Sequence, residues 1–202
     1  MRKVLFIILL CYANMSYAQP VSESTFKYFG VQVGAAMSNM NFNQNSTAPD
    51  GNIKAAWKPG FTFGFLLKLP LSESFSLQPE WSFTRRFGTN NTSGIDYRLD
   101  YLSMPLLLKY LISDRFEVLA GPQLELLVDA HSTNNDQNAD ITHDVEERSI
   151  GFVGGLEVHI ADAFFISARY FQGFNHIGVY QRSSDVKEFK YQVVSLTAGM
   201  NF

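Results

Sequence analysis

The sequence predicts an all-β protein, an eight-stranded antiparallel up-and-down transmembrane β-barrel with both termini periplasmic. Its last segment, from Val194 to Phe202, alternates apolar with small or polar residues and ends on an aromatic residue. Beyond residue 18, no apolar run approaches the roughly 20 residues that a spanning helix needs. A membrane barrel exposes its apolar side chains at every second position, so the mean hydropathy of −0.05 is compatible with this fold.

The N-terminus has the features of a cleaved secretory signal peptide. Arg2 and Lys3 precede an apolar run from Val4 to Tyr12, and Ser16 and Ala18 have the spacing of a signal peptidase site. The chain is therefore expected to divide into the signal peptide at 1–18, a short N-terminal periplasmic segment at 19–27 and the outer-membrane barrel domain at 28–202.

Composition argues against several classes of function. The chain has 16 Lys and Arg against 19 Asp and Glu, a balance that argues against a nucleic-acid partner. Cys11 is the one cysteine and lies in the expected signal peptide, so no disulfide is expected in the mature chain. Phosphate loops, nucleophile elbows and common metal-binding motifs are absent from the sequence. We therefore expect neither enzymatic activity nor a bound cofactor or metal.

Eight segments have the composition and the length of strands that cross a bilayer at a tilt. They lie near residues 28–40, 60–70, 75–87, 96–110, 116–130, 148–160, 163–173 and 190–202. The short connections are at 70–74, 112–115 and 161–162, and the long polar ones are at 41–58, 88–95, 131–147 and 174–189. Short periplasmic turns and long outer loops are typical of outer-membrane barrels.

Alternation along the strands predicts which side chains face lipid. Phe61, Phe63 and Phe65 share one face of the second strand, which should be the lipid face. The opposite faces carry five charged residues in the interiors of strands: Lys68, Glu80, Glu125, Glu157 and Arg169. Side chains fill the interior of an eight-stranded barrel, and buried charges need partners. We predict a structural ion-pair network, centred on Arg169 and the glutamates, that plugs the barrel; a proton or ion path is the functional alternative.

Five motifs follow one another along most of the mature chain. They are Pro59-Gly60-Phe61, Leu77-Gln78-Pro79-Glu80, Tyr101-Leu102-Ser103-Met104-Pro105-Leu106, Ala120-Gly121-Pro122-Gln123 and Ala168-Arg169-Tyr170. In this order they resemble the PorT-like outer-membrane β-barrel family of Bacteroidetes. The resemblance implies an eight-stranded barrel and a link to protein secretion, in which the founding member takes part. Most members of that family have no assigned activity.

The expected partners follow from the fold and the resemblance. Lipid of the outer membrane should surround the barrel, and the terminal Phe202 resembles the signal read by the barrel-assembly machinery. Proteins of a secretion machine are partners that the resemblance implies. Interfacial aromatic girdles should include several of Trp57, Trp81, Tyr97, Tyr101, Tyr110 and Tyr170.

Three alternatives concern other sites or another compartment. The segment 131–147 offers oxygen and imidazole ligands for a cation, although we favour a hydrated acidic loop. The candidate ligands are His131, Asp136, Asp140, His143, Asp144, Glu146 and Glu147. His176, Ser183 and Asp185 supply the residue types of a catalytic site at the outer rim. The same strands would also suit a soluble lipocalin-like barrel that binds an apolar ligand, although the Phe and Leu side chains are bulky for so narrow an interior.

Overall fold

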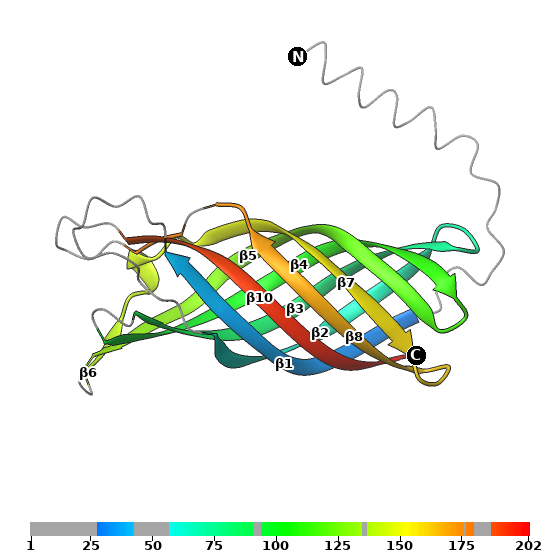
Figure 1. Ribbon diagram of the computed structural model, residues 1–202, viewed down its shortest axis with the longest axis horizontal. Coiled ribbons are helices and arrows are strands. Elements are labelled where there is room, and N and C mark those ends of the chain that lie inside the picture. The colour runs from blue at the N-terminus through cyan, green and yellow to red at the C-terminus, as the bar shows by residue number, and fades with distance from the viewer. Residues whose placement is uncertain (1–27, 43–56, 91–93, 135–136, 176, 180–186) are drawn as a thin grey trace, which may run out of the picture.

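The computed structural model describes residues 28–42, 57–90, 94–134, 137–175, 177–179 and 187–202. The predicted signal peptide and N-terminal segment, residues 1–27, lie outside the described residues. Eight long antiparallel strands form a closed barrel, as predicted (Figure 1). They are β1 (Tyr28–Phe42), β2 (Lys58–Pro70), β3 (Phe75–Asn90), β4 (Ile95–Ser113), β5 (Phe116–Asn134), β7 (Arg148–His159), β8 (Phe164–Gly173) and β10 (Lys187–Asn201).

Each long strand pairs with its neighbour in the chain, and β1 closes the barrel against β10. At this seam Gly34 lies opposite Thr197. A Cβ atom at Gly34 would lie 2.1 Å from the backbone oxygen of Leu196, so the close approach of the two strands requires glycine. The first strand begins and the last strand ends at the same end of the barrel, next to the short turns (Figure 1). We call this end the turn end, and the opposite end the loop end.

The strands at the loop end are longer than predicted. We expected the third strand to end near 87 and the fifth near 130, whereas β3 continues to Asn90 and β5 to Asn134. The fourth strand, expected to begin near 96, begins at Ile95. Two short strands, β6 (Gln137–Asp140) and β9 (Ile177–Val179), lie in segments predicted as loops. Backbone pairing continues there because polar residues can sustain a hydrogen-bonded ladder without the apolar alternation used to locate strands.

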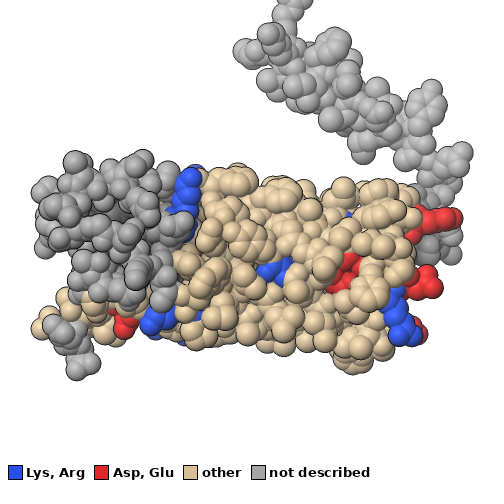
Figure 2. Space-filling model, in the orientation of Figure 1, with Lys and Arg blue, Asp and Glu red and all other residues tan. Residues whose placement is uncertain are grey.

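The face of the barrel seen in Figure 2 is largely uncharged between the two ends. Phe63, Phe65 and Leu196 are exposed on the outer wall, while neighbours such as Thr62 and Thr197 are buried inside. A soluble lipocalin-like barrel would need the reverse arrangement, so that alternative is wrong. None of the described residues forms a helix that is long and apolar enough to cross a membrane.

Of the six aromatic residues among which several were expected at the interfaces, four face outward and two lie inside the barrel. Tyr97 and Tyr101 are buried, because their positions on β4 share the inward face with Leu99 and Ser103. The outward-facing members of that set are Trp57, Trp81, Tyr110 and Tyr170, which are all exposed. The run of apolar residues on β4 obscures the alternation in the sequence.

Candidate functional site

Charged side chains from six strands meet on the inner face of the barrel. They are Lys68 on β2, Glu80 on β3, Lys109 on β4, Glu117 on β5, Glu157 on β7 and Arg169 on β8. Three cations and three carboxylates therefore form one connected series with no formal net charge. Compensation of this kind is needed where water is scarce, since a lone buried charge is costly.

Lys109 is the centre of the part nearest the turn end. Its Nζ lies 2.5 Å from Glu117 Oε2 and 2.5 Å from Glu157 Oε1. It also donates a 3.3 Å hydrogen bond to Gln78 Oε1. The second oxygen of Glu117, Oε1, lies 2.5 Å from Lys68 Nζ. Each carboxylate in this part thus has at least one ammonium partner.

Arg169 and Glu80 form the middle of the series. Arg169 Nη1 lies 2.6 Å from Glu80 Oε2, and Arg169 Nη2 lies 3.9 Å from Glu157 Oε2. The side-chain amides of Gln32 and Gln78 donate to Glu80 at 2.7 and 2.6 Å. Several donors thus surround one carboxylate, which fixes its position as well as its charge.

A second ion pair lies nearer the loop end. Both Nη atoms of Arg86 donate to the carboxylate of Glu125, which also accepts from Ser103 Oγ and Gln123 Nε2. The guanidinium also lies against aromatic rings, whose centroids are 4.9 to 5.5 Å from Arg86 Cζ: Tyr101, Tyr191 and Phe171. Such contacts favour a cation that has lost its water.

The predicted interior residues separate into two groups in the structure. Lys68, Glu80, Glu157 and Arg169 belong to the connected series. Glu125 does not, because it contacts Arg86 rather than Arg169. The expected network centred on Arg169 therefore has a second, separate part.

Sequence reasoning missed three members, Arg86, Lys109 and Glu117. Arg86 lies within the predicted third strand and continues the inward alternation of Ser82 and Thr84, so alternation alone could have placed it inside. Glu117 lies between the apolar Phe116 and Val118 in the sequence, so alternation along the fifth strand could have placed it on the lumen face. The position of Lys109 was hidden by the adjacent leucines of β4.

Among the described residues, one group of three side chains could share a metal ion. Ligand atoms of Glu117, Glu157 and His159 lie within 4.8 Å of one another. Lys68 and Lys109 already neutralise the two carboxylates at 2.5 Å, and a metal ion would have to displace these ammonium groups. The arrangement therefore favours ion pairing over metal binding.

The segment 131–147 is partly regular structure rather than a simple loop. His131 belongs to β5 and Asp140 to β6, and a 3₁₀ turn, η1, spans Thr142–Asp144. Asp140 Oδ1 accepts hydrogen bonds from the amide and hydroxyl of Thr142, at 2.9 and 2.7 Å, which lower the pKa of this carboxyl. Asp136 lies outside the described residues. So do the three rim residues considered for catalysis, His176, Ser183 and Asp185.

Little open space remains between the two ionic parts, whereas a wider cavity of 630 Å³ lies beside Lys68 and Glu117 at the turn end. A cavity of 50 Å³ lies between the two ionic parts and is bordered by Glu80, Arg86 and Arg169 among other residues. A water molecule occupies about 30 Å³ in the liquid, so this cavity has room for one or two.

The comparisons with known proteins agree with this geometry. Residues 17–178 match the family of the outer membrane protein beta-barrel domain. The chain belongs to this family. Its wall of exposed Phe and Leu side chains is accordingly the surface that faces lipid in the outer membrane. The comparison with curated proteins finds no match.

Solved structures of outer-membrane barrels share the fold of this family member. Neisserial surface protein A (NspA) superposes with a TM-score of 0.58 and 15% identity, covering 86% of this chain and 97% of that chain. Ail, the attachment invasion locus protein of Yersinia pestis, gives a TM-score of 0.51 and 18% identity, covering 88% and 99%. At these identities the similarity establishes the architecture.

Proposed function

We propose that this protein is a closed outer-membrane barrel with a structural or interaction role rather than a pore or an enzyme. The observation that supports a closed interior is the cavity of 50 Å³ between two buried ionic parts. The connected series crosses the lumen from Lys68 to Arg169 and leaves its charges paired. In such a barrel the ion pairs replace a water-filled channel.

Conductance of the purified protein in a planar bilayer tests the closed interior. The barrel, shown to be folded by faster gel migration before boiling, should produce no stepwise conductance under conditions in which a general porin does. The same protein in vesicles should not dissipate a pH gradient. Stable channel openings would contradict the plug, and proton flux would favour the alternative of a proton path.

The proposed orientation places both termini and the turn end in the periplasm. An even number of strands and short turns beside the termini support this orientation. If the signal peptide is removed, the mature chain has no cysteine, so single cysteines can be labelled at each end. A membrane-impermeant maleimide should label Glu146→Cys in intact cells and Asp114→Cys only after lysis. The reverse pattern would contradict the orientation.

We also propose that the partners are proteins of a secretion machine, as the PorT-like motifs imply. Photo-crosslinking residues placed at Asp114 and Glu146 sample the two ends of the barrel. Recovery of secretion components at either position would support this role. Recovery of the assembly machinery alone, with normal export of secreted proteins in a deletion strain, would contradict it.

A further inference from the structure

A band of charged side chains lies on the outer wall near the loop end. We define this outer charged band as Arg85, Arg98, Asp100, Asp129 and His131. Arg85 lies opposite Phe61 and Asp100, and Arg98 lies opposite Phe87 and His131. Direct cross-strand partners share one face of a sheet, and Phe61 and Phe87 are exposed, so the band faces outward.

The band lies at the edge of the lipid-facing wall. From Tyr110 to Asp100 along β4, the outward residues are Leu108, Leu106, Met104 and Leu102. Ten residues at about 3.3 Å each, on a strand tilted by about 40°, span about 25 Å along the barrel axis, which is the height of an apolar belt. If Tyr110 marks one boundary of the bilayer, the band marks the other, at the level of lipid headgroups.

Contacts within the band hold its cations in place. Arg85 Nη2 lies 2.6 Å from Asp100 Oδ2, and Arg98 Nη2 lies 2.7 Å from Asp129 Oδ2. The guanidinium of Arg85 also lies 5.6 Å from the ring centroid of Phe61. A cation resting on an outward Phe is suited to a boundary where apolar and polar surroundings meet.

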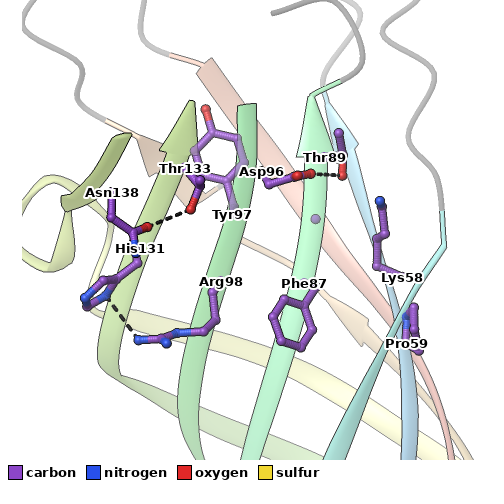
Figure 3. A pocket seen from close by; sticks show the side chains of 11 residues that line it. Lys58, Pro59, Phe87, Thr89, Asp96, Tyr97, Arg98, His131, Thr133 and Asn138 are labelled. Carbon is purple, nitrogen blue, oxygen red and sulfur yellow. Dashed lines mark hydrogen bonds between the residues drawn. The ribbon is translucent and has the colours of Figure 1, made fainter. Parts of the chain in front are cut away.

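A groove of 590 Å³ adjoins the band (Figure 3). Arg98 and His131 lie side by side in it, Phe87 forms an apolar part of its lining, and Lys58 is also exposed to it. Arg98 Nε is buried and has no hydrogen-bond partner among the described residues. Within the same residues, Lys58 forms no ion pair. The groove therefore offers the ammonium group of Lys58 and the partly exposed guanidinium of Arg98, whose side chain is 36% exposed, beside the carboxylate of Asp96.

We propose that this groove binds the phosphate-bearing headgroup of a lipid in the outer leaflet. Phosphate oxygens would accept hydrogen bonds from Arg98 and Lys58, as guanidinium and ammonium groups favour. The acyl chains would lie along the apolar wall below, beginning at Phe61. A membrane lipid fits better than a soluble phosphate compound because the groove opens at the rim of the lipid-facing wall. This inference depends on the proposed orientation, which makes the loop end the outer one.

Native mass spectrometry of the barrel in detergent tests this site. The probe is lipid A with its two phosphates, compared with the same lipid after phosphatase treatment. The wild-type protein should bind the phosphorylated lipid about tenfold more tightly, which corresponds to about one charge-assisted hydrogen bond. The double variant Lys58→Gln/Arg98→Gln should lose this preference. The matched control, Arg115→Gln, removes a cation at the turn end and should keep it.

Three results would overturn the lipid site. They are equal binding of both lipids by the wild type, an unchanged preference in the double variant, and displacement of the lipid by millimolar inorganic phosphate. Gel mobility before and after boiling shows whether each variant is folded. Arg98→Lys keeps the charge but lacks the several donors of a guanidinium, so an intermediate preference is expected. Cysteine labelling separately tests the orientation, so its failure is distinguishable from failure of phosphate recognition.

Discussion

Arg86 and Glu125 form an ion pair inside the barrel, although they come from β3 and β5, which do not pair with each other. The pair therefore crosses the inner face of β4. The exposed fractions of the two side chains are 2% and 0%. Its contribution to the fold depends on keeping both partners, because removal of one leaves an uncompensated buried charge.

Arg86→Met should lower the free energy of unfolding by about 3 to 5 kcal/mol, since Glu125 would lose its cation. Arg86→Met combined with Glu125→Gln should restore most of this loss, because Gln can still accept from Ser103 and Gln123. Reversible urea unfolding in detergent micelles measures both variants. A double variant no more stable than the single one would contradict the coupling.

Arg169→Leu should also lower the unfolding midpoint, because Glu80 would retain only amide donors in a buried site. The expected loss is about 3 to 5 kcal/mol. Arg169→Lys keeps the charge and should lose less, and the same urea titration compares the two. An unchanged midpoint for Arg169→Leu would show that the connected series does not stabilise the barrel.

Gly34→Val should weaken closure of the barrel, since its side chain would meet the backbone of β10 within 2.1 Å. A loss of about 1 to 3 kcal/mol is typical of such overpacking. Ala35→Val is the matched control, because position 35 lies on the outward, exposed face of the same strand. The fraction of fast-migrating barrel in unboiled samples measures closure. Equal effects of the two variants would contradict a specific role for glycine at the seam.

Deletion of Phe202 should reduce insertion into the outer membrane, if this residue is read by the assembly machinery. Phe202 also stacks on Phe29, with ring centroids 6.4 Å apart, and its amide donates to the carbonyl of Phe29 at 2.8 Å. Phe29→Leu removes the stacking and retains the terminal aromatic residue, so it should insert normally. Quantification of barrel in outer-membrane fractions distinguishes the two. Normal insertion of the deletion variant would refute the signal.

The amide resonance of Thr142 should titrate with a midpoint below that of an ordinary Asp, about 3.9. The hydrogen bonds from Thr142 lower the pKa of Asp140. The stabilisation that these hydrogen bonds give the turn is therefore fully present above the ordinary pKa of an Asp. It is lost as the pH falls through the lowered pKa of Asp140. Thr142→Val should raise the titration midpoint of Asp140, which can be followed through the carboxyl resonance of Asp140 itself. An ordinary midpoint in the wild type would contradict these hydrogen bonds.

Much of the barrel could be predicted because alternation within a strand is a local property. Phe61, Phe63 and Phe65 mark a lipid face in the sequence, and the short turns mark where one strand ends and the next begins. The prediction failed where the signal was not local. The face of Tyr101 could not be assigned because its neighbours on β4 are apolar on both faces, whereas the register places it inside.

The sequence by itself determined that the chain is a membrane barrel of eight strands, because side-chain period, strand length and turn composition are written along the chain. Only the tertiary structure decided which charges pair. Glu125 meets Arg86 and Glu80 meets Arg169 because strand stagger and barrel closure set the height of each residue in the lumen. The same stagger brings Arg85 and Asp100 together on the outer wall. Pairing across a barrel depends on register between strands, which a linear pattern does not contain.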